Sequence, residues 1–311
     1  MLEFNQVYNM DCLEGLKQLD SDSVHCCVTS PPYWALRNYG VSGQIGQEDT
    51  PAEYVERLCA VFAEVYRVLR PDGVFFLNIS DTYCGTGNKA DYFDPKNPKG
   101  RTDQKKAKNN RIPGLKQKDL CGIPWWVAFA LRDMGWYLRQ EVIWNKTNCM
   151  PESVTDRCVK SHESVFLFAK SQRYYFDYKA IQEPVAQSTI ERAKRAVSEN
   201  KYTAGAPGQS SQSINKPRSR LSTEVPQWRN KRSVWNIPNQ PLKDAHFASF
   251  PRALAEPCIL AGCPVGGIVL DPFMGSGTTA MTAKLLGRQY IGFELNPEYI
   301  SICNKRIKEG K

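Results

Sequence analysis

The sequence predicts an α/β fold in which helices cover both faces of a mostly parallel sheet. Along the 311 residues, short apolar segments alternate with segments of helical periodicity, the order that successive βα units produce. Segments such as Val24–Thr29 and Val74–Ile79 are largely apolar throughout instead of alternating, as strands buried on both faces are. A composition of 41% hydrophobic and 23% charged residues provides a large core.

The first part of the chain contains most of the expected strands. Proline is favoured at the first helical position, so Pro51 begins a helix, and Arg70-Pro71-Asp72-Gly73 ends it. The expected strands are Phe4–Asn9, Val24–Thr29, Val74–Ile79, Tyr137–Trp144 and Glu163–Phe168. The expected helices are Cys12–Leu19, Pro51–Leu69 and Ile123–Met134.

The last part of the chain returns to the same alternation after a weakly patterned stretch. Helices are expected at Phe250–Ala261, Thr278–Leu286 and Glu298–Lys308, and strands at Gly267–Leu270 and Tyr290–Glu294. These elements complete the pattern of a parallel sheet with helices on both faces.

Two polar, basic stretches, 85–118 and 187–232, interrupt this pattern. The whole chain carries 41 Lys and Arg against 32 Asp and Glu, a formal charge of +9. Residues 99–118 hold eight basic residues and one acid, and residues 187–232 hold ten and three, so each has a net +7 and the rest has −5. Solvated insertions are one interpretation. Nucleic-acid contact is favoured, because the charge lies among Asn, Gln, Ser, Tyr202 and Trp228.

Composition and cysteine usage exclude several classes of protein. No apolar run approaches the roughly 20 residues of a membrane helix, and Met1–Asn5 lacks a basic region followed by an apolar stretch, so a signal peptide is not expected. The eleven cysteines are scattered, odd in number and without a Cys-x-x-Cys pair, and only three histidines accompany them. We therefore expect free, mostly buried thiols in a reducing cytoplasm, no metal site and no membrane.

Four polar signals follow predicted strands at the point where each strand ends. They are Asp11, the segment Thr29–Trp34, the segment Asp271–Thr278 and Glu294. In an open parallel sheet, ligands bind at the carboxyl ends of the strands. The four signals therefore predict one site at one edge of the sheet.

The glycine loop Gly275-Ser276-Gly277 lies between a strand and a helix, where glycine permits a tight turn and close approach of a ligand. No Gly-Lys-Ser/Thr follows it, so it is not a phosphate loop, and it is not a complete Gly-x-Gly-x-x-Gly. Glu294, roughly 20 residues later, has the spacing of a ribose ligand. A plain turn is the alternative; with Glu294, the loop favours a nucleoside cofactor without a pyrophosphate.

The segment Ser30-Pro31-Pro32-Tyr33 combines hydrogen-bond acceptors with an aromatic ring. Two prolines stiffen the backbone and remove two donors, which leaves carbonyl acceptors beside the Ser30 hydroxyl. Acceptors next to the Tyr33 ring suit a planar base with an exocyclic amine. A rigid turn with a packing tyrosine is the alternative interpretation.

Thr29–Trp34 together with Asp271–Thr279 resembles the motif pair of the DNA amino-methyltransferases, which use S-adenosylmethionine. The order of the motifs is similar to that of the beta, circularly permuted, class, and the likeness covers nearly all of the chain outside the basic stretches. The resemblance implies a Rossmann-like seven-stranded methyltransferase sheet, mostly parallel with one antiparallel edge strand.

The same resemblance implies a domain organisation. Residues 1–186 form the catalytic half of the methyltransferase domain, with the basic loop 85–118 inserted. Residues 187–232 form the target-recognition segment, and residues 233–311 form the S-adenosylmethionine-binding half. A second family-like segment, Met150–Glu163, contains His162, which we interpret as a structural contact.

By position, the resemblance assigns nine residues to the cofactor. The loop after Asp271 resembles the one that holds the methionine part, and Asp271 orients that loop or the cofactor's amino group. Glu294 resembles the ribose ligand, Asp11 lies near the adenine amine, and His246–Pro251 resembles a segment that closes over the methionine end. The nine residues are Asp11, Phe250, Asp271, Phe273, Gly275, Ser276, Gly277, Thr278 and Glu294.

The resemblance also places the reaction at Ser30, Pro31, Pro32 and Tyr33. The exocyclic amine of a base is a poor nucleophile, because its lone pair is delocalised into the ring. Hydrogen bonds from the amine to Ser30 Oγ and the Pro31 carbonyl would localise that pair, while Tyr33 and Trp34 stack on the flipped base. The nitrogen then attacks the sulfonium methyl group in line. No metal is needed, because the leaving group is neutral.

Several alternatives concern the substrate. In this family Ser-Pro-Pro-Tyr is associated with cytosine N4 and Asp-Pro-Pro-Tyr with adenine N6, so Ser30 favours cytosine in duplex DNA over adenine. Carbon-5 methylation would need a Pro-Cys nucleophile, and Pro257-Cys258 lies in a predicted apolar helix, where Cys258 is interpreted as core. An RNA methyltransferase, a protein glutamine methyltransferase and a catalytically dead DNA-binding module are more distant alternatives.

The expected DNA contacts lie in the two basic stretches, where phosphate contacts would make binding salt-dependent. They are Lys105, Lys106, Arg111, Arg192, Arg195, Arg218, Arg220, Arg229 and Arg232. The resemblance implies a bacterial or phage-encoded cytoplasmic protein. It leaves open whether a cognate restriction endonuclease acts on the same DNA site and whether the protein is a monomer or a homodimer.

Overall fold

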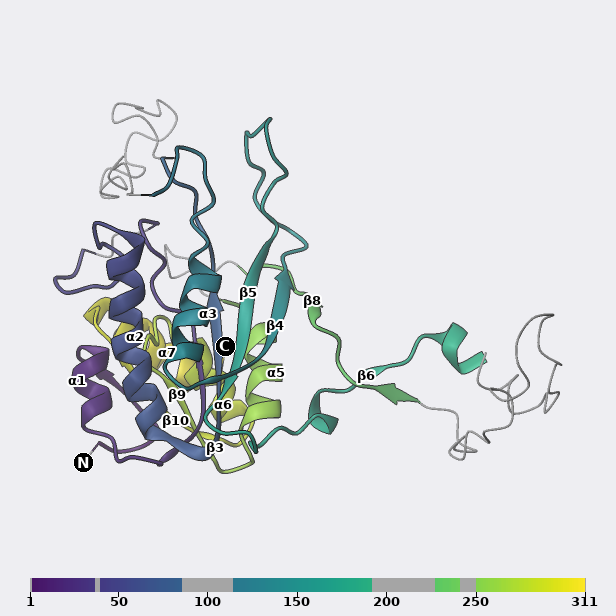
Figure 1. Ribbon diagram of the computed structural model, residues 1–311. Coiled ribbons are helices and arrows are strands. Elements are labelled where there is room, and N and C mark those ends of the chain that lie inside the picture. The colour runs from purple at the N-terminus through teal and green to yellow at the C-terminus, as the bar shows by residue number, and fades with distance from the viewer. Residues whose placement is uncertain (1, 37–39, 86–113, 192–226, 241–249, 311) are drawn as a thin grey trace, which may run out of the picture. The chain divides into compact units, whose positions relative to one another are not determined.

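The computed structural model describes residues 2–36, 40–85, 114–191, 227–240 and 250–310. The chain divides into two units, one formed by residues 1–177 with 232–311 and the other by residues 178–231. The first unit contains the central sheet and all the helices described below (Figure 1).

Within the described residues, the central sheet contains eight strands, and all but one of them run in the same direction. The exception is β5, which pairs antiparallel with β3 on one side and with β4 on the other. Across the sheet, the strands are β1 (Gln6–Asn9), β10 (Gln289–Glu294), β9 (Ile268–Asp271), β2 (Val24–Thr29), β3 (Leu69–Ile79), β5 (His162–Ala169), β4 (Tyr137–Asn145) and β8 (Val234–Asn236).

The α/β class and the mostly parallel sheet are thus confirmed, but two details differ from the expectation. The sheet has eight strands instead of seven, because the short strand β8 pairs parallel with β4. The antiparallel strand is internal instead of at the edge. It follows β4 directly in the chain, so it returns alongside β4 and fills the position between β4 and β3.

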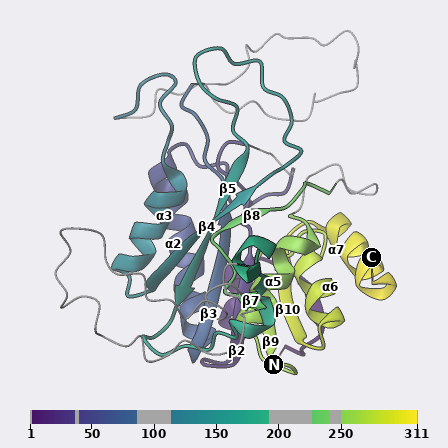
Figure 2. The same cartoon turned by 90° about the vertical axis from the view of Figure 1, so that its right-hand side faces the viewer.

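Helices cover both faces of the sheet, as Figure 2 shows. One face carries α2 and α3, with α1 packed against α2, and the opposite face carries α5, α6 and α7. Their bounds are Cys12–Lys17 (α1), Pro51–Val68 (α2), Ile123–Asp133 (α3), Arg252–Gly262 (α5), Thr278–Leu285 (α6) and Pro297–Glu309 (α7).

Helix α2 shows how local sequence produces these elements. Thr50 accepts a hydrogen bond from the Glu53 backbone N–H at 3.2 Å, and the Glu53 carboxylate accepts one from the Thr50 N–H at 3.1 Å, which completes a capping box. Pro51 occupies the first turn as predicted. The buried stripe of the helix faces the sheet and ends at Val68.

The segment after α2 differs from the prediction. Helix α2 ends at Val68, one residue before the predicted Leu69, and strand β3 begins at Leu69 instead of Val74, because Leu69 pairs with Val24 of β2. The register then shifts, and the next residue of β3 that pairs with β2 is Val74, opposite Cys26. Further along, Phe75 and Phe168 stack at 5.6 Å across β3 and β5 within the core.

All eleven cysteines are free, as expected, and most of them are buried. Cys158 is exposed and Cys59 and Cys149 are half-buried, so these three lie outside the core. Among the described residues, no helix is long and apolar enough to cross a membrane.

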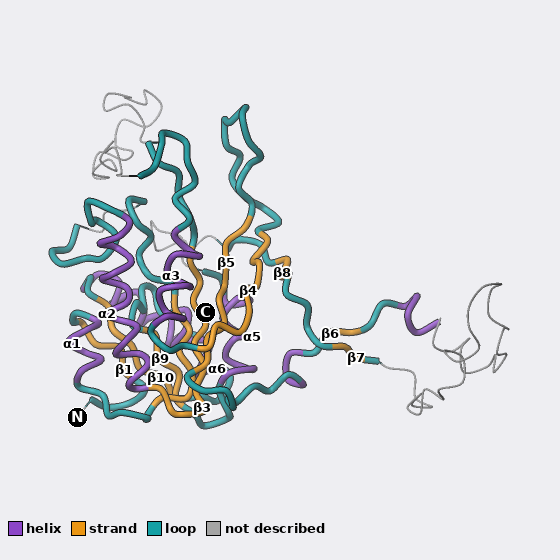
Figure 3. The backbone as a smooth tube through the Cα atoms, viewed as in Figure 1, coloured by secondary structure: helices purple, strands orange, loops and turns teal. Residues whose placement is uncertain are grey.

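The second unit, residues 178–231, contains a two-stranded antiparallel ribbon in its described part. Strand β6 (Glu183–Pro184) pairs with β7 (Trp228–Arg229), and a short 3₁₀ turn covers Lys179–Ile181 (Figure 3). The ribbon joins the two ends of the basic stretch 187–232, and residues 192–226 lie outside the described residues.

Candidate functional site

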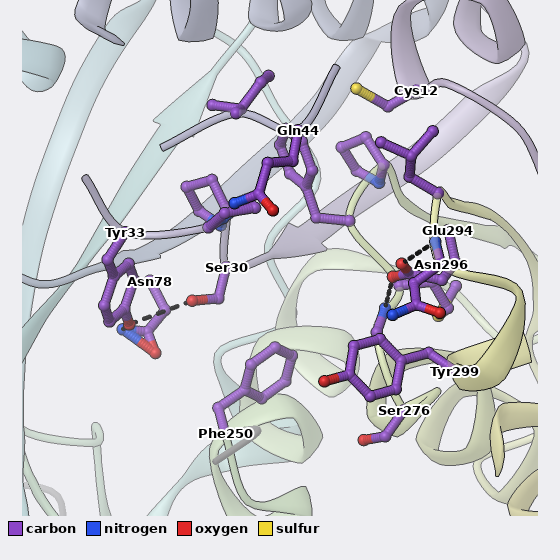
Figure 4. Close-up of a pocket in the computed structure, with 18 of the residues that line it drawn as sticks. Cys12, Ser30, Tyr33, Gln44, Asn78, Phe250, Ser276, Glu294, Asn296 and Tyr299 are labelled. Atoms are coloured by element: carbon purple, nitrogen blue, oxygen red, sulfur yellow. Dashed lines mark hydrogen bonds between the residues drawn. The ribbon is translucent and has the colours of Figure 1, made fainter. Parts of the chain in front are cut away.

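A pocket of about 340 Å³ opens at the carboxyl edge of the parallel strands in the first unit. Each predicted signal contributes to its lining, namely Asp11 after β1, Ser30–Tyr33 after β2, the loop after β9, and Glu294 at the end of β10. Figure 4 shows Ser30, Tyr33 and Asn78 at one end of the pocket and Glu294, Asn296 and Tyr299 at the other. The four segments, each at the end of a strand, thus line one pocket at one edge of the sheet.

At the Glu294 end, a carboxylate fixes the glycine loop. Glu294 accepts hydrogen bonds from the backbone N–H of Gly275 at 2.8 Å and of Asn296 at 2.7 Å. Burial raises the pKa of Glu294. Gly275 and Gly277 both have left-handed backbones, with φ of 53° and 84°, which glycine adopts without strain. The Glu294 carboxylate thus holds the glycine loop in this conformation, and the Gly275 N–H in turn helps to hold the carboxylate in place.

Beneath the loop, Asp271 is almost completely buried and does not line the pocket. Its carboxylate accepts hydrogen bonds from Thr29 Oγ1 at 2.5 Å, Thr279 Oγ1 at 2.6 Å and the Phe273 N–H at 3.0 Å. Burial raises the pKa of Asp271 to about 6, and these donors lower it in part. Of the two predicted roles, the geometry supports the one in which Asp271 orients the loop.

Most of the other residues predicted to bind the cofactor line the pocket, and Gly277 does not. Phe250, Phe273, Gly275, Ser276 and Thr278 line the pocket together with Asp11. Asp11 also caps α1, where its Oδ1 accepts from the Leu13 N–H at 2.8 Å.

Gly277 does not line the pocket; it caps α6 and packs against Cys303. Residues 246–249 of the predicted closing segment lie outside the described residues.

At the Ser30 end, the motif is part of a hydrogen-bond network. Ser30 Oγ lies 3.2 Å from the Tyr33 hydroxyl, which donates to Glu163 Oε2 at 2.6 Å. Asn78 Nδ2 donates to the same carboxylate oxygen at 2.8 Å, and Lys146 forms an ion pair with the other oxygen. Burial, and then the Glu163 charge, raise the pKa of Tyr33 well above its usual value, so its phenol keeps its proton.

Sequence reasoning missed three members of this network. Asn78, Lys146 and Glu163 all line the pocket, yet none was predicted as a site residue. Asn78 is a polar residue inside an apolar strand, and it is 4% exposed with no hydrogen-bond partner for its Oδ1 among the described residues. That polar interruption of Val74–Ile79 was the available signal. Glu163 lies beside His162, which is exposed and outside the pocket lining.

Trp34 does not lie where the prediction placed it. Its ring is 8% exposed, belongs to the core cluster, and donates from Nε1 to the Glu48 carbonyl at 3.0 Å. This side chain packs in the core and is not part of the pocket lining, so Trp34 is not available to stack on a base. The Pro32 carbonyl is also occupied, because it accepts from the Tyr54 hydroxyl at 2.8 Å.

The thiol that carbon-5 methylation would need, that of Cys258, lies in the core. Cys258 is buried in α5, where its Sγ lies 3.3 Å from the Leu254 carbonyl, and it does not line the pocket. Its interpretation as a core residue fits this position.

Two of the predicted DNA-contacting residues lie in the described part of the chain. Arg229 forms an ion pair with Glu183 at 2.9 Å on the β6–β7 ribbon, and Arg232 is exposed before β8. The remaining seven lie outside the described residues: Lys105, Lys106, Arg111, Arg192, Arg195, Arg218 and Arg220.

Comparison with known proteins gives a consistent family. A family model described as DNA methylase matches residues 24–305. The type II methyltransferase M.SmaI of Serratia marcescens is 43% identical over 300 residues, which cover 96% of this chain and 88% of that protein. M.XycI of Xanthomonas campestris pv. cyanopsidis is 42% identical over 308 residues, which cover 99% and 89%.

Two solved structures share the fold. The PvuII DNA methyltransferase, described as cytosine-N4-specific, superposes with a TM-score of 0.63 at 19% identity and covers 100% of this chain and 95% of that one. A putative DNA modification methylase from Thermus thermophilus, solved with S-adenosyl-L-methionine, has a TM-score of 0.59 at 21% identity and covers 98% and 93%. The family match and the type II relatives together establish that this chain belongs to the N6/N4 DNA methylase family and is a DNA methyltransferase.

Proposed function

We propose that this protein transfers a methyl group from S-adenosyl-L-methionine to the exocyclic N4 of a cytosine turned out of duplex DNA. One observation carries the proposal: the Ser30 hydroxyl and the glycine loop held by Glu294 line the same pocket. A nucleoside cofactor at one end and a base amine at the other would therefore meet inside it.

The residues at the Glu294 end fit the cofactor. A Cβ at Gly275 would meet only the Phe273 carbonyl, at 4.0 Å, so the loop leaves room for a ligand. Phe293 and Tyr299 provide apolar walls, and Asp11 and Glu294 provide acceptors for an amine and for ribose hydroxyls. S-adenosylmethionine, when bound, supplies an electrophilic methyl group on a cationic sulfur. These side chains orient it and exclude water from it.

The residues at the other end suit the amine of a base. Ser30 and Pro31 line the pocket. The Ser30 hydroxyl and the Pro31 carbonyl, by accepting from the amine, would localise the nitrogen lone pair. Tyr33 is held by its hydroxyl, so its ring is a fixed wall for stacking. A base inside a duplex cannot reach a pocket at the sheet edge, so the nucleotide has to leave the stack.

The choice of cytosine over adenine rests on Ser30 and on the likeness to a structure described as cytosine-N4-specific. Adenine N6 is the second candidate, since the family contains both specificities. Duplex DNA is the proposed partner, held by the basic stretches 85–118 and 187–232. RNA as the preferred substrate in a parallel transfer assay would contradict this part of the proposal.

Nucleoside mass spectrometry tests the proposal directly. Plasmid DNA is incubated with the purified protein and the methyl donor and digested to nucleosides, and methylation sequencing of the same DNA identifies the recognition sequence. We expect N4-methylcytosine from the wild type and a loss of at least a hundredfold in rate for Ser30→Ala, with the fold and cofactor affinity retained. N6-methyladenine as the sole product would overturn the choice of base.

A further inference from the structure

We infer that Glu163 sets the direction of a chain of hydrogen bonds that runs from Ser30 through Tyr33 to Glu163. This direction makes Ser30 an obligatory acceptor for the target amine. The same chain carries away the proton that the amine loses. This inference rests on the proposed function but not on which amine is methylated. It assigns a role to Glu163, a residue outside both sequence motifs.

The geometry of the chain is continuous. Ser30 Oγ lies 3.2 Å from the Tyr33 hydroxyl oxygen, and that oxygen lies 2.6 Å from Glu163 Oε2. All three residues line the pocket, and the Glu163 side chain is only 9% exposed. The chain thus leads from the reacting end of the pocket into the sheet, where β5 lies beside β3.

The direction of the chain follows from the chemistry of its last member. The Glu163 carboxylate, which forms an ion pair with Lys146, only accepts hydrogen bonds, so the Tyr33 proton points to Glu163. The Tyr33 oxygen is then left as an acceptor, and it receives the Ser30 hydroxyl proton and Asn78 Nδ2, which lies 3.3 Å away. With its proton turned toward Tyr33, Ser30 Oγ presents only lone pairs to the pocket.

Neighbouring donors hold the carboxylate in place. Lys146 pairs with Oε1 of Glu163, and its ammonium group also lies 4.7 Å from the centre of the Trp144 ring. Asn78 donates to Oε2 at 2.8 Å. Since the Lys146 side chain is 20% exposed, this ion pair is shielded from solvent, and Glu163 has little freedom to turn away from Tyr33.

The chain can also move one proton without forming a phenolate. As the nitrogen bonds to the methyl carbon, the carbon–sulfur bond breaks and its electron pair stays on sulfur. The methylated nitrogen gives one proton to Ser30 Oγ, the Ser30 proton passes to Tyr33, and the Tyr33 proton passes to Glu163 Oε2. Each hydroxyl gains one proton and loses one, so the net change is one proton moved from the substrate to Glu163.

A fixed direction has a consequence for selectivity. A base that carries a carbonyl oxygen in place of the amine would face the lone pairs of Ser30 without a hydrogen between them. Such unpaired buried acceptors are costly, so the site should reject uracil in place of cytosine, or hypoxanthine in place of adenine.

The test uses the full chain with Glu163→Gln, which keeps the size but offers an N–H. The chain can then reverse, with the amide donating to Tyr33, Tyr33 to Ser30, and Ser30 to a carbonyl. We expect single-turnover methyl transfer to fall at least a hundredfold with little change in cofactor affinity. Glu163→Asp, which keeps the carboxylate, should recover part of the loss. Glu141→Gln is the matched control, because Glu141 lies on β4, accepts from Ser164 at 2.7 Å and does not line the pocket.

A binding measurement distinguishes a Glu163 that sets the direction of the hydrogen bonds from a Glu163 that only supports the structure of the pocket. Duplexes that carry either the normal target base or its carbonyl analogue are compared by Kd for the wild type and for Glu163→Gln. We expect the wild-type preference for the amine to shrink about tenfold in the variant. Because each duplex is the same for both proteins, the cost of flipping cancels in the ratio.

Two outcomes have different meanings. If the wild type methylates no base amine, the proposed function fails, whatever Glu163 does. If the wild type is active and Glu163→Gln retains both its rate within a few-fold and its full preference for the amine, the inference about Glu163 is overturned while the function stands.

Discussion

The buried carboxyl group of Asp271 leads to a quantitative prediction about stability and pH. The native pKa of Asp271 is about 6, against 3.8 for an unperturbed aspartate, mainly because burial disfavours the charge. The native state therefore binds more protons than the unfolded state between these values. Its stability must fall as the pH rises through this window, which is the reverse of the usual behaviour of an ion-paired aspartate.

The perturbation is Asp271→Asn. The amide oxygen can still accept from Thr29 and from the Phe273 N–H. The new amide N–H₂ meets the Thr279 hydroxyl, which is free to rotate toward the Val28 carbonyl at 3.2 Å. The variant thus keeps the hydrogen bonds beneath the glycine loop and removes only the ionisation.

The magnitude follows from the two pKa values. Each unit between them is worth about 1.4 kcal/mol, and the range from pH 4.5 to 7.5 includes most of the shift. The wild type should therefore lose about 2 kcal/mol of unfolding free energy relative to the variant across that range.

Urea unfolding of both proteins at several pH values measures this difference, since the other titrating groups are common to both. Asp133→Asn, whose side chain is 70% exposed, is the control and should show no such trend. A difference between wild type and Asp271→Asn that stays constant from pH 4.5 to 7.5 would refute the reasoning.

Three further substitutions test the fold and the site. Gly277→Ala places a Cβ 2.4 Å from Cys303 Sγ in a left-handed backbone, so we expect a loss of at least about 1 kcal/mol in unfolding free energy and weaker cofactor binding by calorimetry. Thr50→Ala breaks the capping box with Glu53 and should cost about 1 kcal/mol in thermal unfolding without a change in methyl transfer; equal stability would contradict it. Cys258→Ala removes a thiol buried outside the pocket, so turnover should stay largely intact, and abolished turnover with the fold retained would argue against amine methylation.

The sequence alone was sufficient for the features that depend on neighbouring residues. Hydrophobic period and helix-capping signals located most of the strands and helices to within a few residues, as for Val24–Thr29 and Pro51–Val68, but they missed β8 and the start of β3 at Leu69. The strand-end rule also brought Ser30 and Glu294 to one pocket, because parallel strands of one sheet end at the same edge.

Burial and side-chain direction could not be predicted in this way. Trp34 follows the motif directly and looked like a stacking residue, yet its side chain packs in the core. Asp271 stands at the start of the glycine loop, but it lies beneath the loop and supports it from inside. Such outcomes depend on packing between elements that are distant in the sequence.

The network around Ser30 was decided by the tertiary structure. Glu163 is 133 positions away from Ser30, and Lys146 and Asn78 come from other parts of the chain. They meet because β5 runs antiparallel between β3 and β4, which brings its first residues to the edge where the parallel strands end. Local sequence determined which segments form strands and which residues carry the motifs. The order and direction of those strands determined that the Glu163 carboxylate lies near Ser30. Strand pairing is a non-local interaction, so it cannot be predicted from a short motif.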